Sequence, residues 1–149
     1  MSNKKEIENF IKKLENAKKT VNSELGNAIS KCCIQVQRTI QEGFTATVTN
    51  DEVSYFTHNK RIPHHPSVLG NYPAVDTGTL RRSISFDVEK KGNKIIGRIG
   101  STILEPPYPA FLEYGTSKMF PRPWLKPSMD KNETFIQNMI DEALRKGIK

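Results

Sequence analysis

Apolar residues recur every three or four positions along the first forty residues of the chain. This is the period of one face of an α-helix, and it predicts a long helix from about Lys4 to Glu42, which Gly43 would end. Gly26 and the polar pair Asn22–Ser23 mark where such a helix could bend or split. The apolar stripe consists of Ile7, Phe10, Ile11, Leu14, Ala17, Val21, Leu25, Ala28, Ile29, Cys32, Val36 and Ile40.

A helix of this length would span roughly 55 Å, at about 1.5 Å per residue. That length overhangs any core that a chain of 149 residues can build, so the far end is expected to meet a partner or to fray. A coiled-coil dimer is the competing interpretation. The stripe relies on Ala, Cys and Val and lacks a regular Ile/Leu seam, which disfavours the coiled coil.

After the long helix the pattern changes to alternation of apolar and polar residues. Residues 44–55 predict a short hairpin that turns at Asn50–Asp51. Residues 57–73 contain prolines and histidines without any period, which predicts an exposed loop that orders against a neighbouring subunit. His64 and His65 lack the spacing of a helical metal-binding pair, and no cysteine or acid lies close in sequence, so no metal site is expected.

The clearest hairpin lies in the second half of the chain. Residues 84–89 alternate between apolar and polar positions, and residues 95–99 return after a turn at Lys91–Asn93. A helical turn precedes this hairpin, and either Asp76 or Thr77 could cap it.

Two further helices complete the predicted fold. Tyr108–Tyr114 predicts a short helix with Pro109 at its first position and Gly115 just past its end. Residues 121–127 predict a rigid extended segment, followed by a final helix whose apolar face consists of Met129, Phe135, Ile136, Met139, Ile140, Ala143 and Leu144. The fold class is therefore α+β, with the long N-terminal helix and the C-terminal helix packed on a small antiparallel β-sheet. We expect one domain over residues 1–149, divided into 1–43, 44–74 and 75–149.

Composition and cysteine usage narrow the setting in which the protein works. The hydrophobic share is 36% and the mean hydropathy is −0.58, and no apolar run is long enough to span a membrane. The N-terminus has no apolar core behind its lysines, so we expect no signal peptide. Cys32 and Cys33 are adjacent on a predicted helix and point to different sides of it, which fits free thiols in a reducing cytosol.

A net charge of +7 and a pI near 9.5 suggest acidic or phosphate-bearing partners. The lysines are spread along the chain, however, and acids alternate with those of the N-terminal helix. A solvated helix face explains this pattern without any ligand.

The sequence offers little for catalysis. No Ser, Cys or Thr lies in a sequence typical of a nucleophile elbow, and no helical carboxylate–histidine pair suggests a metal hydrolase. Glu113 is the one acid embedded in apolar sequence, so it is either a general acid with a raised pKa or, more simply, a structural acid. In the structural role it would pair with one of Arg81, Arg82 or Arg122. We expect no enzyme activity, no cofactor and no metal.

Three motifs in the second half resemble a family of small bacteriophage proteins. These are the head-to-tail joining proteins of long-tailed phages and prophages, also called neck, tail-completion or minor tail proteins. Their pattern is Thr-Gly-x-Leu-Arg-x-Ser-Ile, then Tyr-Ala-x-x-x-Glu-Tyr-Gly-Thr, then a Pro-Phe-Leu-x-Pro segment before a C-terminal helix. The matching residues are Thr77, Gly78, Leu80, Arg81, Ser83 and Ile84, then Tyr108, Glu113, Tyr114, Gly115 and Thr116, then Pro123, Leu125 and Pro127.

The chain departs from the family pattern in two places. Pro109 lies between Tyr108 and Ala110, where the family has Tyr-Ala directly, and Trp124 replaces the usual Phe. The resemblance covers the C-terminal half, and residues 44–73 have no counterpart.

The resemblance implies a structural virion protein without catalysis, at the head–tail junction of the virion and in the host cytoplasm during assembly. Copies would form a ring, expected to be sixfold, between the head connector and the tail tube or tail-terminator protein. No membrane partner is implied, but a basic chain near the channel could contact DNA. The alternatives are a tail-terminator ring and a DNA-binding module. The candidate subunit contacts are Phe120, Trp124, His58, His64 and His65.

Overall fold

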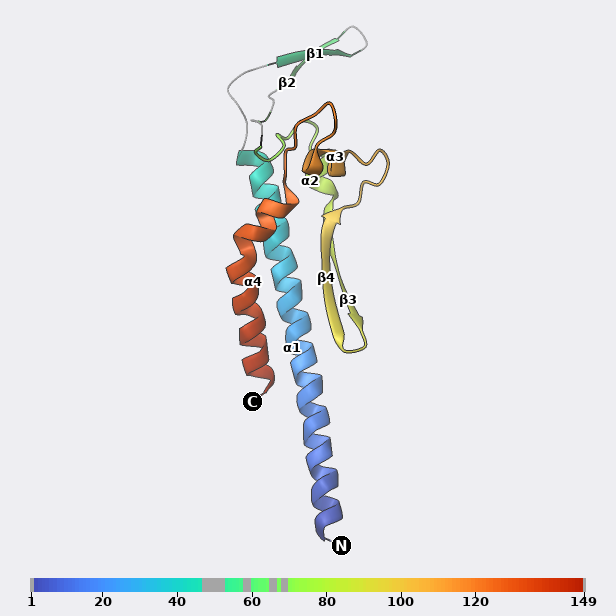
Figure 1. The fold of residues 1–149 in the computed structure, drawn as a ribbon, viewed down its shortest axis with the longest axis vertical. Helices are drawn as coiled ribbons and strands as arrows, with labels where there is room; N and C mark the ends of the chain where they lie inside the picture. Colours follow the sequence, from blue (N-terminus) through green and yellow to red (C-terminus); the bar gives the residue numbers. More distant parts are fainter. Residues whose placement is uncertain (1, 47–52, 58–59, 65–66, 68–69, 149) are drawn as a thin grey trace. The chain divides into compact units, whose positions relative to one another are not determined.

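The computed structural model describes residues 2–46, 53–57, 60–64, 67 and 70–148 of the chain (Figure 1). The predicted α+β class is confirmed, with a long N-terminal helix, a C-terminal helix and small antiparallel sheets. The elements are α1 (Ser2–Ala46), β1 (Val53–Thr57), β2 (Lys60–His64), α2 (Thr79–Ser83), β3 (Ile84–Lys91), β4 (Lys94–Ser101), α3 (Tyr108–Tyr114) and α4 (Leu125–Gly147).

The chain forms two compact units, each assembled from separate stretches of sequence. Unit 1 contains residues 1–33, 87–98 and 133–149, and unit 2 contains residues 34–86 and 99–132. The single domain expected over residues 1–149 stays a prediction.

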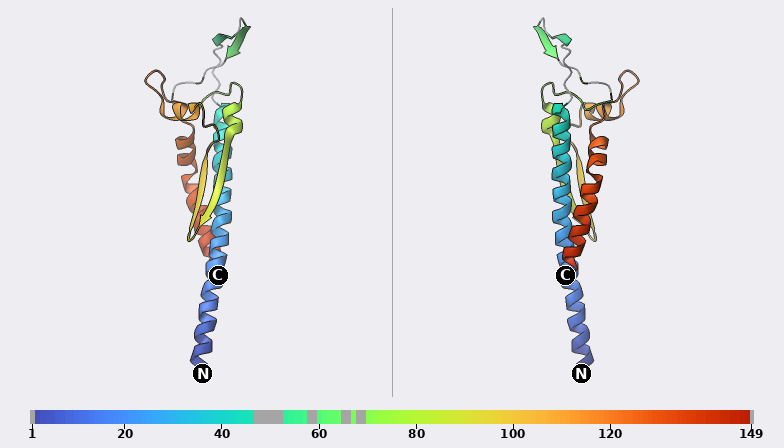
Figure 2. Two further views of the ribbon diagram at one scale, coloured as in Figure 1. Left: turned by 90° about the vertical axis from the view of Figure 1, so that its right-hand side faces the viewer. Right: turned by 90° about the vertical axis from the view of Figure 1, so that its left-hand side faces the viewer.

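In unit 1, α1 packs against the C-terminal half of α4 and the tip of the β3–β4 hairpin. Figures 1 and 2 both show α4 running alongside the middle of α1. Gly147 lies so close to Val21 that an added Cβ would be 2.6 Å from the Val21 Cα. Ala28 and Ala143 are buried between the two helices. Small residues therefore let the helices approach closely over this part of the predicted stripe.

Gly97 in β4 makes a similarly close approach to α1. A Cβ at this position would lie 2.7 Å from the Cys33 Sγ and 2.8 Å from the Ile29 Cγ2. Both cysteines are buried and free, as expected, and burial raises the pKa of the Cys32 thiol and of the Cys33 thiol. Thiols that stay protonated react slowly, which fits a packing role.

This close approach makes Gly97 sensitive to substitution. Gly97→Ala is expected to lower the free energy of unfolding by about 1–3 kcal/mol, because the added methyl overpacks the contact with Ile29 and Cys33. Gly100→Ala in the same strand is the matched control, since nothing lies within 4 Å of its added Cβ. Urea denaturation of both variants makes the comparison. Equal stability of the two variants would contradict this packing.

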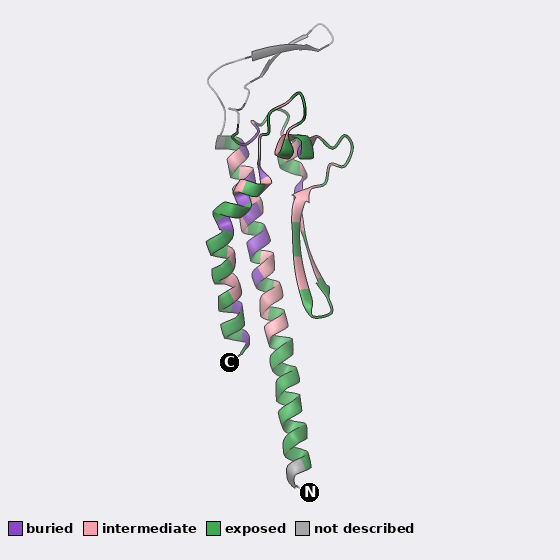
Figure 3. Ribbon diagram, in the orientation of Figure 1, coloured by how far each residue is buried: buried purple, intermediate pink, exposed green. Residues whose placement is uncertain are grey.

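The N-terminal part of α1 has no cover within the described residues. Residues 4–20 are exposed throughout (Figure 3). The exposed residues include apolar side chains of the predicted stripe: Ile7 is 59% exposed and Phe10 is 62% exposed. The structure therefore confirms that α1 extends past the core that this chain builds for it.

The C-terminal end of α1 differs from the prediction. The helix continues through Gly43 to Ala46, and it is a single helix across Gly26. Gly43 does not end the helix. Its lack of a side chain instead makes room for the Tyr72 ring, whose Cε1 and Cδ1 atoms would clash with an added Cβ. The predicted stop was wrong because a long-range contact, and not a turn, requires this glycine.

The core of unit 2 lies between the end of α1 and the start of α4. Phe44, Ile40 and Val36 are its largest fully buried apolar side chains. The Phe44 ring lies 6.3 Å from the Tyr72 ring and 6.0 Å from the Trp124 ring, centroid to centroid. Three aromatic rings from distant parts of the sequence therefore share one cluster.

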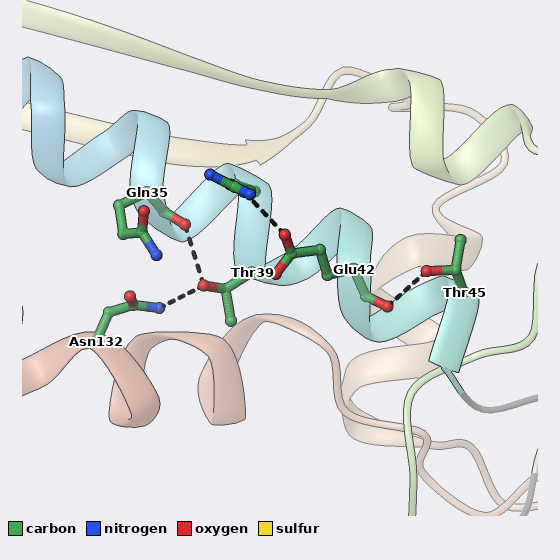
Figure 4. A network of polar contacts seen from close by, with 6 residues as sticks. Gln35, Thr39, Glu42, Thr45 and Asn132 are labelled. Atoms are coloured by element: carbon green, nitrogen blue, oxygen red, sulfur yellow. Dashed lines mark hydrogen bonds and ion pairs between the residues drawn. The ribbon is translucent and has the colours of Figure 1, made fainter.

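A polar network accompanies this core, which the apolar stripes did not predict. The Asn132 side chain donates to the Thr39 hydroxyl at 2.9 Å, and that hydroxyl donates to the Gln35 carbonyl at 3.1 Å (Figure 4). Ser128 is fully buried, and its hydroxyl donates to the Trp124 carbonyl at 2.6 Å. Three buried residues four positions apart thus face this core: Trp124 just before α4, and Ser128 and Asn132 on it.

The two hairpins differ in how well the sequence predicted them. β3 and β4 form the expected pair, joined by Gly92–Asn93 with Gly92 at a φ of 61°. The first hairpin pairs β1 with β2 from Val53↔His64 to Thr57↔Lys60. The prediction placed it at 44–55, but residues 44–46 are helical, and the expected turn at Asn50–Asp51 lies outside the described residues. β2 also occupies part of the predicted loop at 57–73.

Two helix starts differ from the prediction. α2 begins after Gly78, which occupies the N-cap position at a φ of 73° and has no side chain to cap the helix. The Thr77 hydroxyl accepts a long hydrogen bond of 3.4 Å from the N–H of Thr79, the first residue of α2. α4 begins at Leu125, two residues before Pro127. Proline is compatible with the first turn of a helix, because the N–H that it lacks has no partner within the helix. None of the described helices is long and apolar enough to span a bilayer.

Candidate functional site

The second and third motifs meet through the carboxylate of Glu113. One oxygen, Oε2, accepts hydrogen bonds from the backbone N–H groups of Trp124 and Leu125 at 2.7 and 2.9 Å. The other, Oε1, accepts from the Lys126 N–H at 2.9 Å. The following residue, Pro127, has no N–H. Glu113 therefore satisfies the free N–H groups at the start of α4, and its negative charge is favourable at the positive end of the helix dipole.

This geometry corrects the expected partner of Glu113. Among the described residues, Glu113 forms no ion pair with Arg81, Arg82 or Arg122. Its carboxylate binds backbone groups of a segment eleven to thirteen residues away. The acid in the apolar motif is a long-range helix cap.

The segment between α3 and α4 is held by further bonds among motif residues. The Arg122 N–H donates to the Leu112 carbonyl at 2.7 Å, and the Trp124 indole Nε1 donates to the Pro109 carbonyl at 3.1 Å. Gly115 ends α3 at a φ of 75°, as predicted, and an added Cβ would lie 2.8 Å from the Met119 carbonyl oxygen. We call residues 108–127 the motif corner. It is a tight structure that leaves Tyr114 81% and Phe120 70% exposed.

The residues predicted to contact neighbouring subunits differ in how exposed their side chains are. The Phe120 side chain is available to a neighbour. Trp124 is only 3% exposed and packs on Phe44, so its side chain offers no surface to another subunit, and this expectation was wrong. His58 and His65 lie outside the described residues, as does the side chain of His64, whose backbone belongs to β2.

The first motif lies in the same unit and is tied to the end of β4 and to α1. The Ser83 hydroxyl donates to the Leu80 carbonyl at 2.7 Å and lies 2.7 Å from the Ser101 hydroxyl. Ile84 is 2% exposed, and its carbonyl accepts from the Gln37 side chain at 2.7 Å. These bonds hold the end of α2 and the start of β3 against the end of β4 and against α1.

A cavity of about 290 Å³ lies between the first motif and the motif corner. Phe44, Leu80 and Leu112 give it apolar walls, and Arg81 and Arg122 add positive charge. A neighbouring hollow shares the 75–78 turn and Arg81 with it and is also lined by Arg82. We call the two together the arginine pocket. Tyr108 lines it as well, and burial raises the pKa of its phenol.

Arg122 is the unusual member of this pocket. Its Nε is buried and has no hydrogen-bond partner among the described residues. An unsatisfied buried donor costs about 1–3 kcal/mol, and more when the group is charged. The sequence motifs indicated Arg122 only as a possible partner of Glu113. The signal that could have indicated the pocket is the presence of arginines in two motifs with few acids beside them.

No group of three or more histidine, cysteine or acidic side chains within the described part of the chain is placed to hold a metal ion. The comparisons add no relative: the chain matches no protein-family model, no curated protein and no solved structure. The resemblance to phage joining proteins therefore depends on the motif residues themselves and on how they are arranged.

Proposed function

We propose that this protein is a structural component of a long-tailed bacteriophage or prophage that joins the tail to the head as one subunit of a ring. The observation that carries the proposal is the convergence of the three motifs in unit 2. The family-like residue Glu113 on α3 caps α4, which contains Pro127, and Gly115 ends the helix that carries Glu113. Residues that act together in three dimensions give more weight to a shared pattern than isolated matches do.

A ring places a physical demand on its subunit. Each copy must contact its two neighbours through different patches, because a head-to-tail interface is heterologous. Exposed apolar side chains on this chain can supply such patches. Phe120 and Tyr114 extend from the motif corner in unit 2, and Ile7 and Phe10 extend from α1 in unit 1. Clustered exposed apolar residues are typical of interaction sites.

The partners follow from this role. Copies of the chain would contact one another, and the ring, expected to be sixfold, would contact a head-connector protein on one side and a tail-tube or tail-terminator protein on the other. The net charge of +7 would favour non-specific contact with DNA passing through the channel. The location would be the head–tail junction of the virion.

Deleting the gene from its phage or prophage and imaging the lysate by electron microscopy tests this role. We expect filled heads beside separate tails of normal length. Overlong tails would instead indicate a terminator that sets tail length. Intact infectious particles would overturn the structural role, and salt-dependent binding to plain duplex DNA would then be the next property to measure.

A further inference from the structure

The arginine pocket contains more positive charge than the described residues neutralise. Arg81, Arg82 and Arg122 line it, and none of them forms an ion pair within the described part of the chain. Asp76 is the one acid among the described lining residues, and it has an interaction of its own. The buried Nε of Arg122 has no acceptor among these described residues. A carboxylate is the group that a guanidinium binds best in such a place.

The size and walls of the pocket limit what can enter. At about 290 Å³ the main cavity is just below the range of ligand sites, roughly 300–1,000 Å³. It therefore suits one or two amino-acid side chains. Phe44, Leu80 and Leu112 would receive an apolar side chain, while the guanidinium groups would receive an acid.

The same chain displays a segment with this chemistry. Residues 103–107 follow β4 and loop out beside α3 in Figure 1. Leu104 is 79% exposed, and the neighbouring Glu105 is exposed without any hydrogen bond or ion pair within the described residues. The ends of the loop are fixed, since the Ile103 N–H donates to the Ser101 hydroxyl at 3.1 Å and the Tyr108 N–H to the Pro106 carbonyl at 2.8 Å. A short anchored loop loses little entropy on binding.

We propose that the arginine pocket of one copy binds Leu104 and Glu105 of a second copy. The Glu105 carboxylate would bind the guanidinium groups of Arg81 and Arg122, and the Leu104 side chain would pack on Phe44 and Leu112. Neither Leu104 nor Glu105 is among the described residues that line the pocket of their own copy. The contact joins two different patches and is therefore heterologous, so it can repeat around a ring. The inference rests on the proposed function, for which it names the contact between neighbouring subunits.

Disulfide trapping between two single variants of the full-length chain tests the contact. Leu104→Cys and Thr79→Cys are purified, mixed and oxidised, with Thr79 chosen because it is exposed and lines the cavity. Mixed disulfide dimers should exceed those of the control mixture several-fold. The control replaces Thr79→Cys with Glu133→Cys, an exposed position on α4. The wild-type chain is the blank, because Cys32 and Cys33 are buried.

Charge reversal then tests the chemistry of the trapped contact. Adding Arg81→Glu to the Thr79→Cys chain should reduce the mixed dimer several-fold, and so should adding Glu105→Arg to the Leu104→Cys chain. Combining the two reversals should restore part of the yield, because opposite charges face each other again at positions 81 and 105 while Arg122 still repels the new positive charge. Arg81 is used because it is exposed, so that the reversal leaves folding intact. Circular dichroism of each variant checks this.

Each outcome separates the contact from the proposed function. A mixed dimer no more abundant than the control, or dimers of Thr79→Cys with itself only, would overturn the contact, even if gene deletion left heads and tails separate. A trapped dimer that responds to charge reversal would support the contact, even if gene deletion left particles intact. In that case the chain would associate head to tail for a purpose other than joining.

Discussion

Replacing Trp124 with alanine is expected to lower the free energy of unfolding of unit 2 by about 4 kcal/mol, within the range of about 3–5 for a buried aromatic residue. The side chain is 3% exposed, and its ring lies 6.0 Å from that of Phe44. Truncation would leave a cavity beside the aromatic cluster. It would also remove the indole donor from the Pro109 carbonyl.

Trp124→Phe is the matched control, because it keeps an apolar ring and removes the indole N–H. Its expected loss is about 1–2 kcal/mol, for one hydrogen bond and a smaller side chain. Since Trp124 is the only tryptophan, far-UV circular dichroism in increasing urea must follow unfolding of all three proteins. A loss below about 1 kcal/mol for Trp124→Ala would mean that this residue does not hold the core together.

The second large effect is expected at Glu113. Glu113→Ala removes the acceptor of three backbone N–H groups at the start of α4. The expected loss in the free energy of unfolding is about 2–3 kcal/mol, because these hydrogen bonds involve a charged group and also cap a helix. Urea denaturation at neutral pH measures it.

Glu113→Gln separates the charge from the shape of the side chain. Its amide keeps one oxygen acceptor but presents an NH₂ group where the other carboxylate oxygen was, so we expect a loss close to that of alanine. Glu133→Ala is the surface control, since the exposed side chain of this acid on α4 has no hydrogen bond within the described residues. It should change stability by less than about 0.5 kcal/mol. If Glu113→Ala were as mild as Glu133→Ala, the capping bonds would contribute nothing.

The two variants also bear on how the family motifs are understood. If both destabilise unit 2 as expected, Glu113 and Trp124 act in folding, and loss of assembly in these variants would follow from loss of structure. In the proposed ring, contacts between subunits would then come from exposed groups such as Phe120, Leu104 and Glu105. Assembly experiments should therefore use those positions.

The sequence by itself determined the elements whose signal is local and periodic. The stripe from Ile7 to Ile40 predicted α1, and alternation on both sides of Gly92 predicted the β3–β4 hairpin. Helix and strand periods are read directly from residue spacing, because each element buries one face. Gly115 at the end of α3 was predicted for a similarly local reason, since a glycine just past a helix readily adopts a positive φ, here 75°.

The tertiary structure decided everything that depends on residues far apart in sequence. Spacing showed that Glu113 needed a partner, but only the fold supplied the N–H groups of α4 in place of an arginine. Gly43 was predicted as a stop, yet the Tyr72 ring explains it. The arginine pocket brings together residues from Phe44 to Arg122, and no local pattern contains that information. Local propensity specifies which element forms, whereas the partner of a side chain depends on long-range packing.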